Sequence, residues 1–356
     1  KSVEKPEATG TYTYDGTAQT FAITGSDRDY YTITGQTSGI NAGSYEATAS
    51  LNDKTETAWV GGSTENISLT WAINPKAIEP TIADIPDQEY TGSRIEPKIT
   101  VKDGETPLTE DDYTVSYGDN ISVGVNNGFV TIKAAENGNY TFSDVTAYFN
   151  IVAQAGSISI TANGAEYTGS AYAESNIEVT KNNETANVTY TYYTDADATE
   201  LTTAENSGAA YDGAAPKNAG TYYVKASMAA SENYGSATSD VASFTIDKKA
   251  LTVTADNQSI TFGDAAPAYT FTATDYVGDD DDNVVTANLD CDYKPGDNVG
   301  TYTITVTATA ANYDITCNSG MLTVAKKQLT AADLTASETN PTAKEYDGTT
   351  ELPGVT

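Results

Sequence analysis

A short start motif built on an aromatic residue recurs along the chain, and each copy opens a block of alternating Thr, Val, Ile and Tyr. The copies read Tyr-Asp-Gly-Thr from Tyr14, Tyr-Thr-Gly-Ser from Tyr90 and from Tyr167, and Phe-Gly-Asp from Phe262. Each block closes on an apolar strand, and lysines mark most of the junctions. Self-similarity of this kind is typical of tandem arrays of small domains. It predicts a chain built from similar units in a row.

The spacing of the motif divides the chain into four blocks and the start of a fifth. Each block is close in size to an immunoglobulin-type sandwich. Alternation with a period of two, as in residues 301–308, predicts strands, and no window sustains the period of an amphipathic helix. We therefore expect an all-β, elongated, tandem array of Ig-like β-sandwich domains. The predicted domains are block 1 (1–76), block 2 (77–153), block 3 (154–248), block 4 (249–326) and a truncated fifth block (327–356).

Charge and composition exclude several classes of function. The chain has 18 Lys and Arg against 50 Asp and Glu, a net charge of −32, and such a chain repels nucleic acids and other polyanions. No apolar stretch approaches the length of a membrane span, so we expect no membrane insertion in this fragment. Histidine is absent, which excludes a Ser-His-Asp triad, a His-activated cysteine and an H-E-x-x-H zinc site. We predict that the protein is not an enzyme and has no catalytic residues.

Three blocks carry the pattern Asn-x-Gly-x-Tyr at the head of a late strand, whereas block 2 departs from it. In Ig domains a tyrosine at this position hydrogen-bonds back to the preceding turn, and a glycine before it lets the chain turn. The residue two places after the tyrosine is Ala47, Val224 or Ile304, which predicts apolar packing where antibody domains have a disulfide. The predicted structural corners are Tyr45, Tyr222 and Tyr302, with Gly43, Gly220 and Gly300.

An Asn-Tyr pair follows that strand in three blocks, at Asn139, Asn233 and Asn312. Asparagine tolerates turn conformations, and a tyrosine ring can cover apolar surface while its hydroxyl stays polar. We interpret the pair as the turn of the last hairpin, with the tyrosine lying back on its own sandwich.

Together with the start motifs, the segments Asn-Ala-Gly-Thr-Tyr-Tyr-Val-Lys-Ala (218–226) and Asn-Tyr-Asp-Ile-Thr-Cys-Asn-Ser-Gly-Met-Leu-Thr-Val (312–324) resemble the MBG and YDG repeat domains. These are bacterial Ig-like modules of very large surface proteins in Gram-positive gut bacteria. Block 4 is similar to the MBG type, although Phe262 stands where tyrosine is usual, and the motif at Tyr346 resembles the start of a YDG domain. The resemblance implies an exported, cell wall-attached or secreted adhesin or stalk, with no catalytic residue to carry over. Signal and anchor are then expected outside this fragment.

Two features of block 4 are candidates for a crosslink and a metal site. Cys291 and Cys317 can meet in an antiparallel sheet, so a disulfide in an oxidising compartment, two buried free thiols and a reactive thiol are all open. Calcium binds several oxygen ligands, and the acidic run is the candidate site, although a solvated loop is the alternative. The run consists of Asp279, Asp280, Asp281, Asp282 and Asn283.

The first functional hypothesis is a non-catalytic extracellular stalk or adhesin segment that spaces or presents a binding region. The second is a module that binds a host glycan, mucin or secreted host protein such as an immunoglobulin. It predicts one repeat with distinctive loops, and block 3 has an insertion-like segment at 194–200. A third places the blocks as accessory modules of a secreted polysaccharide-degrading enzyme. No cofactor is required by any of them, and the high charge favours a monomer.

Overall fold

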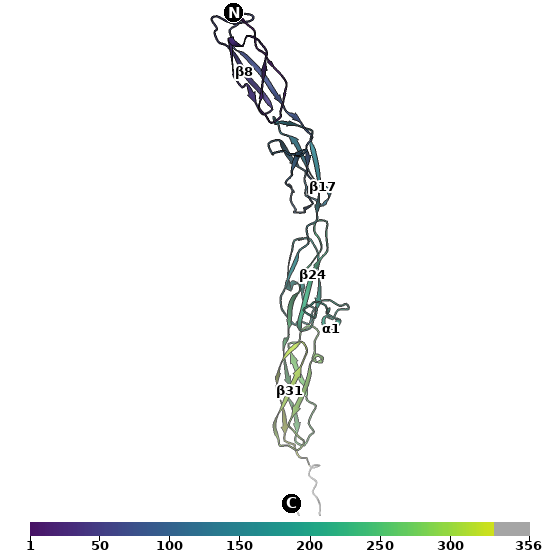
Figure 1. Ribbon diagram of the computed structural model, residues 1–356. Coiled ribbons are helices and arrows are strands. Elements are labelled where there is room, and N and C mark those ends of the chain that lie inside the picture. Colours follow the sequence, from purple (N-terminus) through teal and green to yellow (C-terminus); the bar gives the residue numbers. More distant parts are fainter. Residues whose placement is uncertain (331–356) are drawn as a thin grey trace, which may run out of the picture. The chain divides into compact units, whose positions relative to one another are not determined.

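The computed structural model describes residues 1–330 (Figure 1). Within this range the chain is strand and turn apart from three single-turn 3-10 segments and one four-residue helix, α1 (Ala204–Ser207). Among the described residues no helix has the length and apolar character needed to cross a bilayer. From residue 331 onward, the predicted fifth block and its motif at Tyr346 lie outside the described residues.

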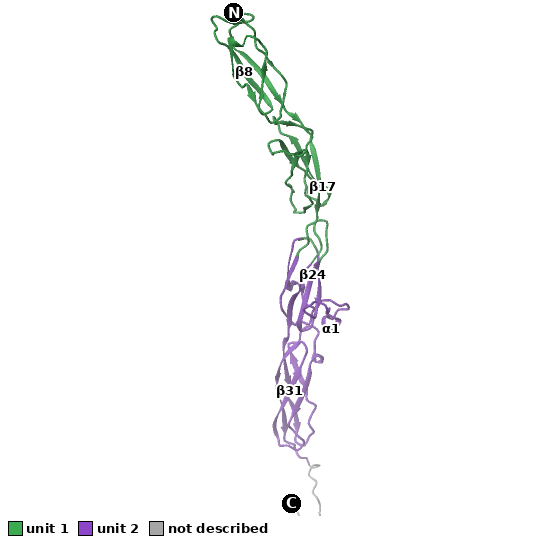
Figure 2. Cartoon of the chain, in the orientation of Figure 1, with its two compact units in different colours: residues 1–157, 183–186, 228–237 green, residues 158–182, 187–227, 238–356 purple. Residues whose placement is uncertain are grey.

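The chain divides into two compact units (Figure 2). Unit 1 contains residues 1–157, which cover blocks 1 and 2, together with residues 183–186 and 228–237 of block 3. Unit 2 contains the rest of block 3 and all of block 4. Blocks 1 to 4 are the residue ranges predicted above.

Every block contains a four-strand path with the same order. A short opening strand pairs in parallel with the closing strand of the block. The closing strand pairs antiparallel with the long strand that begins at the corner. The long strand pairs on its other side with the strand that precedes the corner. The repetition of this order shows tandem Ig-like domains. The paths are β3 (Tyr12–Thr13), β10 (Ile67–Asn74), β8 (Gly43–Leu51), β6 (Tyr31–Gly35); β13 (Gln88–Glu89), β19 (Val145–Val152), β17 (Gly124–Ala134), β16 (Tyr113–Tyr117); β21 (Ala165–Glu166), β26 (Ala242–Asp247), β24 (Gly220–Met228), β23 (Val188–Tyr193); and β28 (Gln258–Thr261), β33 (Gly320–Ala325), β31 (Gly300–Thr309), β30 (Thr286–Cys291).

The other strands form a second set of pairings in each block, apart from β25 (Ala237–Thr238), which pairs with β24. The first strand of this set runs parallel to the strand that follows the Asn-Tyr pair in blocks 2 and 4. The remaining elements are β1 (Ser2–Val3), β2 (Ala8–Thr9), β4 (Gln19–Thr20), β5 (Ala22–Ile23), η1 (Arg28–Tyr30), β7 (Ser38–Gly39), β9 (Ala58–Trp59), β11 (Lys76–Ala77), β12 (Thr81–Ile82), β14 (Val101–Asp103), β15 (Thr106–Pro107), β18 (Tyr140–Thr141), β20 (Ile158–Ala162), η2 (Glu174–Asn176), β22 (Ile177–Lys181), β25 (Ala237–Thr238), β27 (Lys249–Ala255), β29 (Phe271–Thr274), η3 (Asp282–Val284) and β32 (Tyr313–Asn318).

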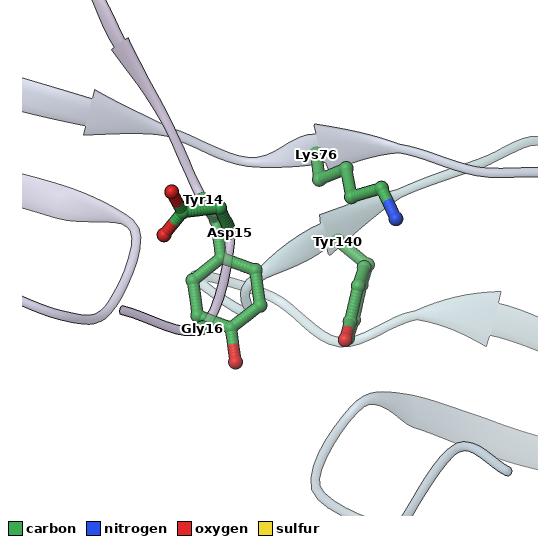
Figure 3. Close-up of a pocket in the computed structure, with 5 residues that line it drawn as sticks. All are labelled: Tyr14, Asp15, Gly16, Lys76 and Tyr140. Carbon is green, nitrogen blue, oxygen red and sulfur yellow. The ribbon is translucent and has the colours of Figure 1, made fainter. Parts of the chain in front are cut away.

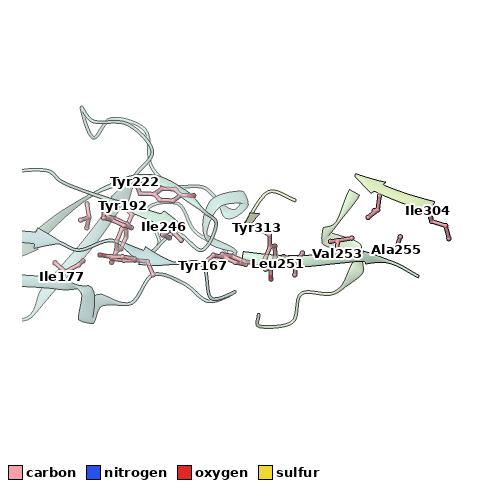
Figure 4. Packing of buried hydrophobic residues seen from close by; sticks show 14 of the residues in the cluster. Tyr167, Ile177, Tyr192, Tyr222, Ile246, Leu251, Val253, Ala255, Ile304 and Tyr313 are labelled. Carbon is pink, nitrogen blue, oxygen red and sulfur yellow. The ribbon is translucent and has the colours of Figure 1, made fainter. Parts of the chain in front are cut away.

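The long strands β8, β24 and β31 bury alternate residues, as expected for strands with one face on a core. The residue two places after the corner tyrosine is fully buried in all three strands, namely Ala47, Val224 and Ile304. The prediction of apolar packing at these positions is confirmed. In unit 2 the buried residues of blocks 3 and 4 form a single cluster, in which Tyr167 and Tyr313 lie where the two blocks meet (Figure 4).

Block 2 closes its corner differently because it lacks the Asn-x-Gly-x-Tyr pattern. Asn120 is buried there, and its side-chain nitrogen Nδ2 donates to the carbonyl oxygens of Ile95 and Phe129, at 3.0 and 3.1 Å. Its oxygen Oδ1 accepts the N–H of Phe129 at 2.9 Å. The register of β17 shifts between Gly124 and Gly128. A buried amide thus makes the hydrogen bonds that link this corner to its surroundings.

Candidate functional site: the junctions between blocks

The aromatic residue of every start motif is bonded to the last residues of its own closing strand. In all four blocks its backbone N–H donates to a carbonyl oxygen at that point: Tyr14 to Asn74 at 2.9 Å, Tyr90 to Val152, Tyr167 to Asp247 and Phe262 to Ala325, each at 2.8 Å. The start motif therefore lies where one block ends and the next begins.

The Asn-Tyr pair of a following block lies at the same place. At the first three junctions, the residue two places after the acceptor of the start-motif bond donates its backbone N–H to the carbonyl oxygen of the asparagine in the pair. These bonds join Lys76 to Asn139 at 2.9 Å, Gln154 to Asn233 at 3.0 Å and Lys249 to Asn312 at 3.0 Å. The register is uniform along the described chain. It brings the Asn-Tyr pair against the start motif of the preceding block.

The two tyrosines pack edge to face with nearly constant geometry. The ring centroids and interplanar angles are 5.4 Å and 85° for Tyr14 and Tyr140, 5.6 Å and 81° for Tyr90 and Tyr234, and 5.5 Å and 80° for Tyr167 and Tyr313. Such pairs contribute roughly 0.5–1.5 kcal/mol beyond the burial of their area. The interpretation of this tyrosine as lying only on its own sandwich was incomplete, because its ring also contacts the preceding start motif.

The asparagine side chain joins the corner of the preceding block at two junctions. In unit 1, Asn139 Oδ1 accepts the N–H of Ala42 at 2.8 Å, and its Nδ2 donates to Asn41 Oδ1 at 3.3 Å. In unit 2, Asn312 makes the same two bonds, with the Ala219 N–H at 2.9 Å and with Asn218 Oδ1 at 3.2 Å. A single side chain thus satisfies a backbone donor and an amide acceptor of the neighbouring block.

The tyrosine hydroxyl bonds back to the turn before it in two of the three predicted corners, those of blocks 1 and 4. Tyr45 Oη donates to the carbonyl oxygen of Asn41, and Tyr302 Oη donates to that of Asn298 at 2.8 Å. Burial raises the pKa of Tyr222, an effect that a hydrogen bond with the side chain of Asn206 partly offsets. The backbone φ angles are +153°, +155° and +153° at Gly43, Gly220 and Gly300, a region that side-chain-bearing residues rarely adopt. The corner fixes the turn whose backbone N–H donates to the junction asparagine.

A shallow pocket of about 230 Å³ lies at the junction of blocks 1 and 2. Its lining residues are Tyr14, Asp15, Gly16, Lys76 and Tyr140, and Figure 3 shows the two tyrosine rings side by side beneath Lys76. Small-molecule sites usually enclose about 300–1,000 Å³. This pocket is smaller than that range, and its two tyrosines already contact each other.

The junction of unit 2 has an additional group, Asp280. Its Oδ2 accepts hydrogen bonds from Tyr167 Oη at 2.8 Å and from Tyr313 Oη at 2.7 Å. Both tyrosines are 2% exposed. One carboxylate oxygen therefore links the start motif of block 3 to the Asn-Tyr pair of block 4.

This arrangement changes the interpretation of the acidic run. Asp281 accepts from the backbone and side chain of Asn283, Asp282 accepts from Tyr276 Oη at 2.8 Å, and Asp279 is exposed. Among residues 1–330 no three acidic, Cys or His side chains converge in a way that could hold a metal ion. The structure therefore gives no support to the candidate calcium site, because three of its carboxylates already accept hydrogen bonds from the protein.

The cysteines of block 4 are not bridged. Cys291 ends β30 opposite Ile304, in the path β28-β33-β31-β30. Cys317 lies in β32 opposite Val253, in the other sheet of the block, β29-β27-β32. Both thiols are free, and Cys317 is exposed. The candidate disulfide is therefore not formed in this structure, in which the two cysteines lie on strands of different sheets.

The unit 2 junction should weaken at high pH. Burial, followed by the hydrogen bond to Asp280, raises the pKa of Tyr167 to about 12. A raised folded-state pKa gives stability that is complete below the ordinary tyrosine value of about 10 and lost as the pH rises through about 12. We expect hydrogen exchange of the Tyr167 and Tyr313 backbone, corrected for its intrinsic pH dependence, to increase across that window. Tyr167→Phe should remove most of the dependence, and an unchanged profile in that variant would count against this origin.

The ring pair of unit 1 should be energetically coupled. Tyr14→Ala and Tyr140→Ala are expected to be non-additive by about 1 kcal/mol, because either change alone already removes the edge-to-face contact. A double-mutant cycle on urea unfolding measures the coupling. Tyr30→Ala with Tyr140→Ala is the matched control and should be additive, since Tyr30 instead lies beneath the Lys1 ammonium.

The sequence shows the Asn-Tyr pair and the Asn-x-Gly-x-Tyr pattern, but reading block by block does not show that they bind each other across a junction. The signal that could have found this is their order. Where a block carries Asn-x-Gly-x-Tyr and another block follows, as for blocks 1 and 3, the next block carries Asn-Tyr. Asp280 gave no such signal, because it is one of four adjacent aspartates.

Comparisons with known proteins give one family match and several similar structures. Residues 251–323 match the family of the MBG domain (YGX type). No curated protein matches the sequence significantly. Sidekick-1 immunoglobulin domains 1–5 are similar at 10% identity, over 92% of this chain and 80% of that chain, with a TM-score of 0.25. Domains 4–9 of the surface layer protein SbsC are similar at 14% identity, over 93% and 66%, with a TM-score of 0.19.

A third similar structure is BT4661 of Bacteroides thetaiotaomicron, a SusE-like surface-located polysaccharide-binding protein, at 15% identity over 90% of this chain and 72% of that chain. Its TM-score of 0.17, like the two above, is too low to support an argument about function. The family match carries more weight because it falls within the predicted block 4. Residues 251–323 thus match the MBG domain (YGX type) and lie within a row of tandem Ig-like domains.

Proposed function

We propose that this chain is a non-catalytic segment of a bacterial surface protein, exposed outside the cell, that spaces or presents a binding region. The observation that supports the proposal is the repeated junction. The same ring pair, backbone bond and asparagine bridge occur at the junction of blocks 1 and 2 and again at that of blocks 3 and 4. A spacer depends on such a contact, because it needs each block to be held in one placement against the next.

The energetics of each junction suit this role. Two cross-block hydrogen bonds at roughly 1 kcal/mol each, and a ring pair of similar worth, favour one relative placement of adjacent blocks. Linkers alone would leave free hinges, because interfaces between domains of one chain are usually small and polar. The net charge of −32 disfavours side-by-side association of copies. The chain would act through distance and stiffness within each unit.

The test is to loosen the junctions while keeping the blocks folded. Asn139→Ala combined with Asn312→Ala removes both asparagine bridges, and neither residue contributes to a core cluster. Small-angle scattering should show a broader distribution of dimensions for the variant than for the native protein, with unchanged circular dichroism. Asn66→Ala combined with Asn288→Ala is the matched control. Equal flexibility of native protein and variant would contradict the spacer proposal.

A second candidate function, binding of a host glycan, mucin or secreted host protein, is favoured by one observation. Between β23 and β24 the chain forms a protruding loop that contains the segment 194–200 and α1 (Figure 1). Tyr211 lies in the same stretch of chain and is 70% exposed. Exposed tyrosines are frequent in binding sites. A panel of glycans, mucins and immunoglobulins, tested with and without calcium, decides this candidate. Saturable binding that Tyr211→Ala abolishes would establish it, and no binding across the panel would remove it.

A further inference from the structure

Block 4 ends with a start motif and a corner like those through which blocks 1 and 3 contact the block that follows them. We call these two features together the half-junction. The Phe262 N–H donates to Ala325 as Tyr14 and Tyr167 donate to their own closing strands. Tyr302 holds the Asn298 carbonyl as Tyr45 holds that of Asn41. Gly300 pairs with Val324, beside Ala325, so the corner and the start motif flank the end of the same strand.

Among residues 1–330, this half-junction differs from the other two in being uncovered. Phe262 is 40% exposed and Val299 is 43% exposed, whereas Tyr167, the counterpart of Phe262 in block 3, is 2% exposed. Val299 takes the place of Ala42 and Ala219, whose N–H groups donate to a junction asparagine. Within the described part of the chain, neither the Val299 N–H nor the Asn298 side chain has a hydrogen-bond partner.

We propose that Phe262, Asn298 and Val299 form a docking surface for the Asn-Tyr turn of a further Ig-like block. The asparagine Oδ1 of that block accepts the Val299 N–H, its Nδ2 donates to Asn298 Oδ1, and its tyrosine ring packs edge to face on Phe262. The inference rests on the proposed spacer function and names the partner that the end of block 4 selects. Its grounds are the two occupied junctions, in which the same three positions make these contacts.

Phe262 also sets the type of partner. In unit 2 the carboxylate of Asp280 accepts from the hydroxyls of both Tyr167 and Tyr313. Phenylalanine has no hydroxyl, so a carboxylate brought to this position would lose one of its two donors while being removed from water, which is costly. The surface therefore favours a block of the Asn139 and Tyr140 type over one that carries an aspartate like Asp280.

A fusion protein that retains residues 1–327 of the native chain tests the inference. The register makes Lys327 equivalent to Lys76 and Lys249, so residues 1–327 are followed directly by a second copy of residues 77–153. Hydrogen exchange of the Val299 amide, read by mass spectrometry, should slow by about tenfold or more relative to the native chain, as expected when an exposed amide becomes bonded. Asn139→Ala in the fused copy should restore fast exchange.

A second fusion guards against misfolding of the added block. Residues 1–327 followed by 250–326 add a copy of the MBG domain. It should slow the Val299 amide less than the first fusion does, and Asp280→Ala in the added copy should increase the protection. A fusion to residues 3–76 is the control without an Asn-Tyr turn, since Thr57 and Ala58 stand at those two positions, and should give no protection.

The Ala42 and Ala219 amides in the same samples distinguish the possible failures. If these two are protected and Val299 exchanges fast in both fusions, the docking surface is wrong and the spacer proposal stands. If all three exchange fast, the spacer proposal fails as well. Protection of Val299 in the native chain that increases with protein concentration would assign the surface to a second copy, and would overturn the inference that it is meant for a further block in the row.

Discussion

Replacing Asp280 with alanine is expected to lower the free energy of unfolding of unit 2 by about 3 kcal/mol, because the change leaves two hydroxyls without their acceptor. Tyr167 and Tyr313 are each 2% exposed, so water does not replace the carboxylate without rearrangement of the junction. Tyr313 Oη keeps one bond, since it also accepts the Val277 N–H at 3.1 Å. The loss should therefore fall more heavily on Tyr167.

Two further variants separate the causes of that loss. Asp280→Asn keeps an oxygen acceptor and removes the charge, so it should cost less than alanine. Asp279→Ala removes an exposed neighbouring carboxylate and should be nearly neutral. Urea unfolding followed by hydrogen exchange locates the effect in unit 2. Fluorescence of the two tryptophans, both in block 1, should not change. Equal losses for Asp279→Ala and Asp280→Ala would contradict the assigned role.

The repeated strand order could be predicted from the sequence because it depends on short-range signals. Alternation in β31 and the buried positions Ala47, Val224 and Ile304 follow from which face of a strand meets the core. Each signal lies within a few residues of the feature that it specifies. The all-β, Ig-like architecture needed nothing more.

The junction chemistry could not be predicted in the same way because its partners lie in different blocks. The bond from the Ala42 N–H to Asn139 joins residues 97 positions apart, and that from Tyr167 to Asp280 joins residues 113 positions apart. Asp280 is chemically identical to its neighbours, and only its place on the loop turns it toward the tyrosines. The positions of Cys291 and Cys317 in two different sheets could not be predicted for a related reason, since sequence spacing does not say which sheet receives a strand.

Gly169→Ala is the change that should most directly separate backbone strain from junction contact. Gly169 has φ of +75°, and a methyl group there would lie 3.1 Å from the Cα of Gly278 and 3.2 Å from the carbonyl oxygen of Val277, both in block 4. These are backbone atoms, so relief requires the two blocks to move. We expect a loss of about 3 kcal/mol from unit 2, part from the left-handed backbone and part from the overlap.

Gly16→Ala is the matched control, because it occupies the same position of the start motif in block 1. Its φ is +80°, and an added methyl group meets nothing within 4 Å. It should therefore cost only the backbone strain, about 1 kcal/mol, and leave the junction intact. The comparison is read from urea unfolding of each variant, with protection of the Ala42 and Ala219 amides reporting the two junctions.

Equal costs for the two glycines would mean that the close approach of Gly169 to Gly278 adds nothing, and that the start motif contributes only a turn. A larger cost at Gly169, together with loss of protection at Ala219 alone, would show that this glycine is needed so that the backbones of adjacent blocks can approach each other.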